Sequence, residues 1–413
     1  MKCPHRVPFQ KEMLMLPIEI QSGVYWIGVN DRTTDLFEGL WPIAYEGVSY
    51  NSYFIDGRTK AIIDGTKSTK VEEFFDQVRE LTDISTVDYL IINHMEPDHS
   101  GLLKALRSIV PHITILCSPK AKDMLQSFYG IADNVRTVVD GETLSLGTTE
   151  LKFFSTPFVH WPETIMTYDT SRRILFSCDA FGGYGAFHGA LFDDEGTEAT
   201  FYESEALRYF SNILTTFSRM VLRAIEKLAG TPIDVIAPSH GLIWRQDPGR
   251  IVELYKRWAG YATGRTEAGI TLIYGSMYGF TETMMNAIAR GISSVGIPLK
   301  IFNAARTHPS YILPSLWTRA GVMVGAPTYE GALFPLVVHV LNIAAMKRVL
   351  NKKVARFGSY GWSGGAQRNF EKIIEPLDWE LTDVLEFIGK PTKEDLKRGE
   401  EFGARFAELV KAG

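Results

Sequence analysis

The segment Tyr89–Leu103, YLIINHMEPDHSGLL, places the strongest constraint on how this chain can fold. An apolar run typical of a buried strand ends in four ionisable side chains within six positions, His94, Glu96, Asp98 and His99. Removing such groups from water costs on the order of several kcal/mol each unless an opposite charge compensates. The fold must therefore place this segment where something binds these side chains.

Three more strand-like runs end in a histidine or an aspartate. His160 follows LKFFSTPFV, Asp179 follows ILFSC, and His240 follows IDVIAPS. Strand ends that gather at one edge of a sheet are where α/β proteins place ligands, and imidazole and carboxylate groups bind first-row transition metals. A lone histidine after a strand is more often a core residue, and Asp98 could simply cap a helix. The cluster and the three later residues together nevertheless predict a metal site.

Composition excludes several other functions. The formal net charge of -5 argues against a general nucleic-acid-binding protein. The three cysteines, Cys3, Cys117 and Cys178, form no C-x-x-C pair, so we expect neither a disulfide framework nor a cysteine-ligated iron site. This cysteine usage indicates a reducing, cytoplasmic setting. The N-terminal segment MKCPHRVPFQKEMLML lacks the apolar core of a signal peptide, and no run is long enough to span a membrane.

The 413 residues are enough for two domains. In the first part of the chain, short strands and hairpins are mixed with helices. Beyond it the strands ITLIYG, AGVMVGAP and KKVARFGSYG alternate with helices and are apolar, which indicates a parallel sheet covered on both faces. The segment 258–269 is rich in Gly, Ala and Thr and has no apolar periodicity. We therefore predict domains at 1–262 and 268–413.

The segment 274–284, YGSMYGFTETM, predicts a strand, a loop and a helix. It lacks the lysine of a nucleoside-triphosphate P-loop and the G-x-G-x-x-G of dinucleotide folds. Backbone N–H groups and the Ser276 and Thr281 hydroxyls could still surround a phosphate at the helix N-terminus. The later loops GAPTYEG and GSYGWSGG carry Tyr329, Tyr360 and Trp362 beside glycines, which suits a flat ring ligand. Alternatively, these aromatic residues fill a domain interface and the first loop is a plain turn.

The N-terminal residues resemble the metallo-β-lactamase-like domain, and in particular its diiron branch, the flavodiiron proteins. The zinc hydrolases of that superfamily carry a histidine where this chain has Glu96. The additional carboxylate makes the site more anionic, which favours iron over zinc. The resemblance implies two sets of three ligands and one bridging ligand, which are His94, Glu96 and His160 for one iron, Asp98, His99 and His240 for the other, and Asp179 as the bridge.

The three C-terminal loops resemble those of flavodoxin, in which one loop holds the FMN phosphate and two loops flank the isoalloxazine ring. The matching architecture is a doubly wound parallel sheet in the order 2-1-3-4-5 with FMN at the switch point. The FMN-binding residues that this resemblance implies are Ser276, Met277, Tyr278, Gly279, Phe280 and Thr281 in the first loop, Pro327, Thr328, Tyr329 and Glu330 in the second, and Ser359, Tyr360, Gly361, Trp362, Ser363 and Gly364 in the third.

Together the two halves resemble a flavodiiron protein in its two-domain form, with a metallo-β-lactamase-like αββα sandwich followed by a flavodoxin-like domain. The resemblance implies a cytoplasmic oxidoreductase that reduces dioxygen to water, nitric oxide to nitrous oxide, or both. It implies a head-to-tail homodimer or a dimer of dimers. With no further domain expected after Gly413, electrons would come from a separate rubredoxin or a reduced deazaflavin coenzyme. Neither nucleic acid nor a membrane is expected as a partner.

Two alternatives stay open on the residues alone. A lactamase-fold hydrolase with a non-redox flavodoxin-like appendage would cleave a thioester or phosphodiester without its flavin. An electron carrier with a structural metal site would reduce its flavin but consume no gas. The preference between dioxygen and nitric oxide is also open, because some relatives carry a tyrosine where this chain has Phe210, beside Tyr209, and others a histidine where it has Glu38.

Overall fold

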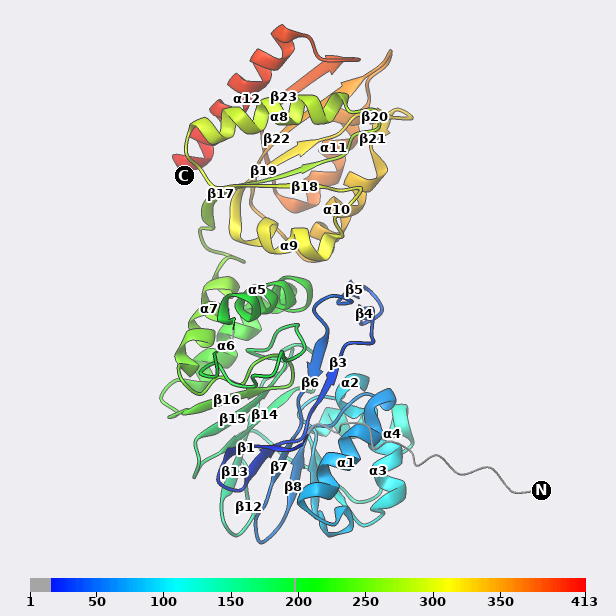
Figure 1. Ribbon diagram of the computed structural model, residues 1–413, viewed down its shortest axis with the longest axis vertical. Coiled ribbons are helices and arrows are strands. Elements are labelled where there is room, and N and C mark those ends of the chain that lie inside the picture. The colour runs from blue at the N-terminus through cyan, green and yellow to red at the C-terminus, as the bar shows by residue number, and fades with distance from the viewer. Residues whose placement is uncertain (1–15, 197) are drawn as a thin grey trace, which may run out of the picture. The chain divides into compact units, whose positions relative to one another are not determined.

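A computed structural model describes residues 16–196 and 198–413, so Cys3 and most of the N-terminal segment discussed above lie outside the described residues. The chain divides into two compact units (Figure 1). The predicted boundary between residues 262 and 268 stays a prediction; residues 262–266 lie between α7 (Pro248–Gly260) and β17 (Glu267–Tyr274). None of the described helices is long and apolar enough to cross a membrane. The first unit comprises the residues up to Asp35, Ile43–Ala206 and Lys227–Val252, and the second comprises Leu36–Pro42, Leu207–Glu226 and Glu253–Gly413.

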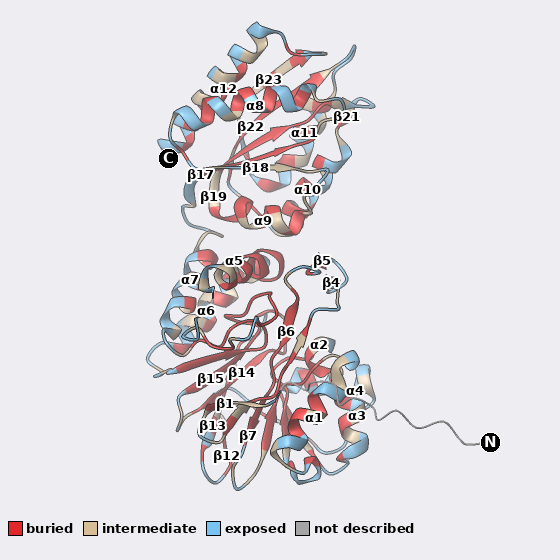
Figure 2. Ribbon diagram, in the orientation of Figure 1, coloured by how far each residue is buried: buried red, intermediate tan, exposed pale blue. Residues whose placement is uncertain are grey.

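Two β-sheets form the centre of the first unit, in the orders β1-β2-β7-β8-β9-β10-β11 and β12-β13-β14-β15-β16. Tyr53 of β7 and Phe176 of β15 have ring centroids 5.0 Å apart, so the sheets pack face to face. Every residue of β14, β15 and β16 is buried, which means that this part of the second sheet is covered on both faces (Figure 2). The strands are β1 (Ile18–Gln21), β2 (Val24–Trp26), β7 (Tyr53–Ile55), β8 (Ala61–Ile63), β9 (Tyr89–Ile91), β10 (Thr114–Cys117), β11 (Val135–Thr137), β12 (Thr143–Ser145), β13 (Glu150–Ser155), β14 (Ile165–Asp169), β15 (Ile174–Cys178) and β16 (Val235–Pro238).

Helices α1 (Val71–Leu81), α3 (Leu103–Ile109) and α4 (Pro119–Tyr129) cover the outer face of the first sheet (Figure 1). Apolar residues at helical spacing, Phe74, Phe75 and Val78 of α1, are buried in one core with the strand residue Leu90. The strand–helix–strand order and the two hairpins expected from the sequence are present. The predicted αββα sandwich is confirmed.

The chain is helical from Ala199 to Leu228, but the helix changes pitch within this stretch. The chain forms α5 (Ala199–Tyr209), a π-helical turn (Phe210–Leu214), a 3-10 turn (Thr215–Phe217) and α6 (Ser218–Leu228). The Ser211 hydroxyl donates to the carbonyl of Leu207 at 2.7 Å, and the Ser218 hydroxyl donates to that of Thr215 at 2.7 Å. Such side-chain bonds compete with the regular backbone ladder and favour a local change of pitch.

The second unit contains a parallel sheet in the strand order β18-β17-β19-β22-β23, which is the predicted 2-1-3-4-5 order. Helices α8 and α12 pack on one face, where their apolar residues share a core with the strands, and α9, α10 and α11 lie on the other face (Figure 1). The flavodoxin-like fold is confirmed. The elements are α8 (Phe280–Ser294), β18 (Leu299–Asn303), α9 (Pro309–Thr318), β19 (Arg319–Gly325), α10 (Pro335–Met346), β22 (Lys353–Tyr360), α11 (Ala366–Ile374), β23 (Glu380–Ile388) and α12 (Lys393–Lys411).

Short elements connect these layers. Three two-stranded ribbons pair β3 with β6, β4 with β5, and β20 with β21. A one-turn helix, α2, follows β9 and carries part of the ionisable cluster. The bounds are β3 (Val29–Asp31), β4 (Leu36–Phe37), β5 (Trp41–Pro42), β6 (Val48–Tyr50), α2 (Pro97–Ser100), β20 (Thr328–Tyr329), β21 (Ala332–Leu333), and 3-10 turns at Ser68–Lys70, Ile84–Thr86 and Glu375–Leu377.

Candidate dinuclear metal centre and flavin pocket

The seven predicted metal ligands come from four loops that the two sheets bring together. His94, Glu96, Asp98 and His99 follow β9, with the last two inside α2. The other three follow strands of the second sheet, at positions 160, 179 and 240. The strand order places β15 beside β16, so Asp179 and His240 emerge from neighbouring parallel strands at the same edge. The side chains of His94, His99, Asp179 and His240 are almost fully buried.

The ligand atoms form two sets, within each of which all atoms lie no more than 4.8 Å apart. Asp179 joins the sets because its two oxygens face in different directions. Its Oδ2 lies 3.5 Å from His94 Nε2 and 3.4 Å from His160 Nε2, whereas its Oδ1 lies 3.1 Å from His99 Nε2 and 3.4 Å from His240 Nε2. The sets are His94, Glu96, His160 and Asp179, and Asp98, His99 and His240.

Neighbouring charges shift the pKa values of His94, His99 and Asp179 toward their charged forms. Burial acts to lower the pKa of His94, but hydrogen bonds to Glu163 and Glu96 outweigh it and raise the pKa to about 10. Burial also acts to lower the pKa of His99, but the charges of Asp98 and Asp179 outweigh it and raise the pKa to about 9. Burial opposes the ionisation of Asp179, yet His99 and His160 hold its pKa well below the ordinary value. The buried carboxylates therefore create a strong demand for positive charge.

The donor set fits two cations. Ligand atoms about 2.0–2.2 Å from one ion are roughly 3–3.6 Å from each other, and the contacts of Asp179 span 3.1–3.5 Å. Both oxygens of Asp98 and the Oδ2 of Asp179 are buried and have no hydrogen-bond partner among the described residues. Their neighbours are imidazole Nε2 atoms 3.3–3.5 Å away, too far for good hydrogen bonds. Buried carboxylate oxygens that lack good hydrogen bonds are costly, so their presence among four imidazoles favours bound metal over an ordinary hydrogen-bond network.

Two buried carboxylates that support the cluster were missed in the sequence. Glu163 accepts from His94 Nδ1 at 2.6 Å and from the N–H of Met95 at 3.0 Å. Asp64 accepts from the N–H of Asn93 at 2.7 Å and so fixes the residue before His94. Glu163 follows His160 by three residues in the same HWPE segment, and an acid there is a signal that could have been used. Asp64 follows a strand with no local motif around it.

Cys178 also approaches the cluster, since its sulfur groups with His99 and Asp179 as a third potential ligand set. Burial raises the pKa of its thiol well above the ordinary value, and the neighbouring Asp179 acts in the same direction. A protonated thiol is a weak ligand. The carboxylate and imidazole sets are therefore the better candidates.

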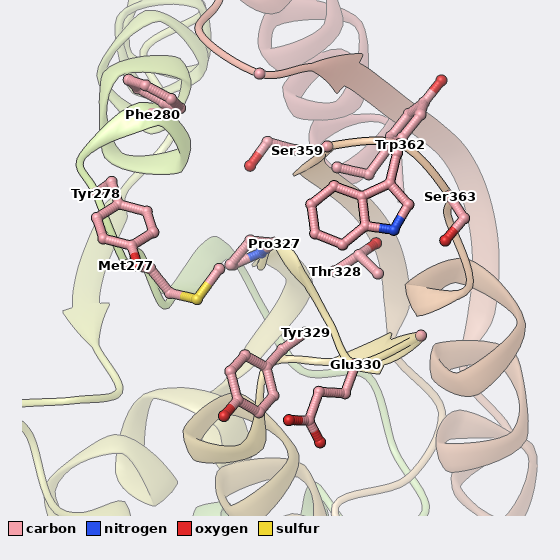
Figure 3. Close-up of a pocket in the computed structure, with 14 residues that line it drawn as sticks. Met277, Tyr278, Phe280, Pro327, Thr328, Tyr329, Glu330, Ser359, Trp362 and Ser363 are labelled. Carbon is pink, nitrogen blue, oxygen red and sulfur yellow. The ribbon is translucent and has the colours of Figure 1, made fainter.

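The second unit contains a cavity of about 690 Å³ at the ends of β19 and β22. Figure 3 shows Met277, Tyr278 and Phe280 on one side of it and Trp362 on the other, with Tyr329 between them. Tyr278 is 83% exposed and Trp362 is 95% exposed, which leaves both rings free to flank a flat ligand. Of the predicted FMN residues, twelve line the cavity: Met277, Tyr278, Phe280, Pro327, Thr328, Tyr329, Glu330, Ser359, Tyr360, Gly361, Trp362 and Ser363.

Four predicted residues do not line this cavity: Ser276, Gly279, Thr281 and Gly364. The first three shape the loop before α8. The Ser276 hydroxyl accepts from the N–H of Gly279 at 3.1 Å, and Gly279 precedes α8 with a φ of 86°. The Thr281 and Ser359 hydroxyls lie 3.3 Å apart. This geometry leaves N–H groups of the helix start available for an anion. Gly331 and Gly389 line the cavity and were not predicted; Gly331 directly follows the predicted second loop, and Gly389 follows β23, outside the three predicted loops.

Phe210 and Glu38, the two positions expected to influence the preference between dioxygen and nitric oxide, have different surroundings. The Phe210 ring packs against Tyr255, Trp258 and Trp317, with centroids 5.3, 5.8 and 6.3 Å away. It therefore belongs to an aromatic cluster of the second unit. The Glu38 carboxylate accepts from the indole of Trp41 at 3.0 Å.

Comparison with known proteins agrees with both halves. Residues 48–241 match the family described as ODP family beta lactamase, and residues 272–403 match the flavodoxin family. The anaerobic nitric oxide reductase flavorubredoxin of Pectobacterium atrosepticum is 36% identical over 398 residues, which are 95% of this chain and 77% of that protein. Among solved structures, the rubredoxin oxygen:oxidoreductase of Desulfovibrio gigas has a TM-score of 0.90 at 27% identity, covering 96% of this chain and 99% of that chain. The flavodiiron protein of Giardia intestinalis has a TM-score of 0.92 at 28% identity, covering 97% and 98%.

The chain combines a lactamase-like sandwich, which holds two sets of imidazole and carboxylate ligands, with a flavodoxin-like sheet. This combination defines the class of proteins that join a dinuclear metal domain to a flavin domain. The similarity covers nearly the whole chain and most of each relative. The chain belongs to the flavodiiron protein family.

Proposed function

We propose that this protein is an oxidoreductase that reduces dioxygen to water, nitric oxide to nitrous oxide, or both, at a diiron centre that receives electrons through FMN. The observation that carries the proposal is Asp179, whose two oxygens face two separate sets of imidazole nitrogens. A flavin-sized cavity in the same chain supplies the second requirement. Two of the relatives described above have names that state an activity, one a nitric oxide reductase and the other an oxygen oxidoreductase.

The metal roles follow from the two sets. His94, Glu96 and His160 would hold one iron, and Asp98, His99 and His240 would hold the other, with Asp179 shared. All four imidazoles present Nε2 to the carboxylates. The four imidazoles and Asp179 are almost completely buried, which strengthens the electrostatic interactions among them.

The flavin roles follow from the cavity. The loop of Ser276 and Gly279 and the start of α8 would bind the phosphate, while Tyr329, Trp362 and Tyr278 would contact the ring system. Backbone groups of the third loop, including Ser359 and Gly361, would bind the polar edge of the ring. The twelve predicted residues that line the cavity and the phosphate loop together form the proposed FMN site. When bound, FMN and the two irons supply the one-electron chemistry that amino-acid side chains lack.

The cavity also suggests how the protein assembles. The rings of Trp362 and Tyr278 are highly exposed beside the half-exposed Met277 and Tyr329, which is a larger apolar group than isolated surface residues explain. We propose that a second copy of the chain covers it in a head-to-tail homodimer, or in a dimer of such dimers. Rubredoxin or a reduced deazaflavin coenzyme is the proposed electron donor. A reducing, cytoplasmic location would keep Cys117 and Cys178 as the free thiols seen here.

The first test is cofactor content. Protein produced with iron available should contain about one FMN and two irons per chain, as measured by flavin absorbance and metal analysis. Zinc without flavin would overturn the proposal. It would instead favour the lactamase-fold hydrolase, an alternative that the relatives named above do not support.

The second test identifies the gas. Enzyme reduced anaerobically is mixed in a stopped-flow instrument with dioxygen or with nitric oxide, and flavin reoxidation is followed. Rapid reoxidation by at least one gas is expected, and the faster one is the preferred substrate. Repeating turnover with rubredoxin or reduced deazaflavin as donor identifies the donor. If neither gas reoxidises an enzyme that contains FMN and two irons, the electron-carrier alternative replaces the proposal.

A further inference from the structure

The contacts behind the ligands differ between the two metal positions. In the set that contains His94, the imidazole Nδ1 donates to the carboxylate of Glu163 at 2.6 Å, and both side chains are fully buried. In the other set, His240 Nδ1 donates to a neutral acceptor, the carbonyl of Ser49, at 2.7 Å. The Nδ1 of His99 is buried and has no hydrogen-bond partner among the described residues.

Glu163 is held in place for this contact. Its Oε1 also accepts from the N–H of Met95 at 3.0 Å, which fixes the carboxylate beneath the turn that carries His94. The Oε2 is buried and has no hydrogen-bond partner in the part of the chain that the structure describes. The negative charge of Glu163 is therefore directed mainly at His94. The Trp161 and His94 rings pack perpendicular to each other with centroids 4.9 Å apart, and the His94 and Glu163 side chains are not exposed to water.

A carboxylate behind a metal-binding imidazole makes the ring a stronger donor than a backbone carbonyl does. Nδ1–H shared with an anion leaves more electron density on Nε2, the atom that faces the metal position. The buried charge also acts directly on the cation through a medium of low polarity. Both effects grow with the charge on the metal, so they favour a ferric ion over a ferrous ion.

We propose that Glu163 is a positioning residue that makes the two iron positions unequal. The first position is held by His94, Glu96 and His160, and the second by Asp98, His99 and His240. Iron at the first position is bound more tightly and retains the ferric state more strongly than iron at the second. This inference rests on the proposed diiron function. It adds that electrons arriving at the centre reside first on the second position.

The variant Glu163→Gln tests the charge with little change of shape, because the amide oxygen can still accept from His94 Nδ1. Samples reduced anaerobically with dithionite are exposed to increasing concentrations of a ferrous chelator, and the iron that remains per chain is counted. Wild type should lose its irons in two separate phases. In the variant, the later phase should move 10- to 100-fold toward lower chelator concentration, as is typical when such a partner is removed, while the earlier phase stays in place.

The second readout is the redox titration of the iron centre, followed by electron paramagnetic resonance. Wild type should pass through a mixed-valent state over a wide range of potential. Glu163→Gln should narrow that range by raising the lower of the two iron potentials, with about 59 mV for each tenfold loss of ferric over ferrous preference. A purely structural role would weaken both irons together and would not move one potential alone.

The matched control is Asp169→Asn. Asp169 is a fully buried carboxylate of β14 that accepts from the Thr149 hydroxyl at 2.6 Å and from Arg172, and no metal ligand contacts it. It should leave both chelation phases in place. If Glu163→Gln does not fold, Glu163→Asp keeps the charge at a longer distance and should shift the later phase by a smaller factor.

The outcomes separate the two levels of inference. A wild-type protein without two irons contradicts the proposed function. A wild-type protein with two irons and gas-dependent flavin reoxidation, whose chelation phases and potentials are unchanged by Glu163→Gln, overturns only the role of Glu163. Equal weakening of both irons in Glu163→Gln, or the same effect from Asp169→Asn, also overturns that role.

Discussion

Asp179 is the residue through which the two halves of the metal cluster are joined. Replacing it by asparagine keeps the size of the side chain but exchanges one oxygen for an amide nitrogen, which does not bind a cation. We expect Asp179→Asn to retain FMN, to hold at most about one iron, and to reoxidise its flavin with gas more than about a hundredfold more slowly. Metal analysis and stopped-flow absorbance measure both effects, and Asp169→Asn is the control.

Lys352 shows that a buried charge need not belong to a site. Its ammonium donates to the carbonyls of Trp317 at 3.0 Å and Arg319 at 2.7 Å, and burial lowers its pKa to about 7 from an ordinary value of 10.5. Because the unfolded chain binds a proton that the folded chain releases between these two pKa values, the free energy of unfolding rises as pH rises through this range. The rise between pH 7 and pH 9 should be about 2 kcal/mol.

Urea denaturation of wild type and Lys352→Met at the two pH values measures this contribution. The variant should lose the pH-dependent part, so the difference in unfolding free energy between the two proteins should change by that amount from pH 7 to pH 9. Lys353→Met is the control, since the Lys353 side chain bonds the carbonyl of Leu409 near the surface. Equal pH dependence in wild type and Lys352→Met would contradict the assignment.

At the scale of elements, periodicity and strand-end residues carry most of the predictable information. The apolar runs before His94, Asp179 and His240 are strands, and the flavin loops follow strands as expected. The features that the local sequence did not predict depend on contacts between segments far apart in the chain. The neighbourhood of β15 and β16 joins segments almost sixty residues apart, and the turn to Glu163 is set by tertiary contacts. The π-helical turn at Phe210–Leu214 likewise reflects side-chain bonds that override helix propensity.

The flavin loops approach each other so closely that they need glycine. Gly365 has a φ of 135°, and a Cβ there would lie 2.2 Å from the carbonyl oxygen of Gly331, which lines the cavity. We expect Gly365→Ala to displace the second loop from the third and to weaken FMN binding by about tenfold or more, since such strain costs about 1–3 kcal/mol. Gly260→Ala, at the end of α7, where a Cβ meets nothing within 4 Å, should bind FMN as wild type does. Equal affinities in a fluorescence titration of the two variants would contradict this account.

At the scale of the whole molecule, the two cofactor sites have complementary properties. The ligands of the metal cluster are buried among charged groups, whereas the rings around the flavin cavity are open and apolar. A flavin in such an open cavity can exchange electrons with a donor and with an acceptor that approach its exposed edge. A buried metal cluster accepts electrons only from a group that docks against its own domain. The arrangement of chains in the assembly therefore decides which flavin serves which metal centre.

The proposed head-to-tail homodimer can be tested with mixed dimers. One chain carries Asp179→Asn and keeps its flavin. The other chain carries Ser276→Glu, which places a negative charge in the phosphate loop. This second variant should not bind FMN, but its metal ligands are unchanged. In a head-to-tail dimer, the flavin of the first chain faces the intact metal centre of the second. Doubly tagged heterodimers should then reoxidise their flavin with gas at about half the wild-type rate per dimer, since one of two electron paths is complete.

Each variant homodimer lacks a complete path and should be inactive, which provides the control. Flavin and iron analysis of the heterodimer must show that the first chain brings FMN and that the second brings two irons. If such a heterodimer reduces neither gas, electrons pass within one chain, and the surface around Trp362 must be covered by the metal domain of its own chain. If it is active, electrons cross between chains, and dilution that separates the subunits should abolish turnover of the wild-type enzyme as well.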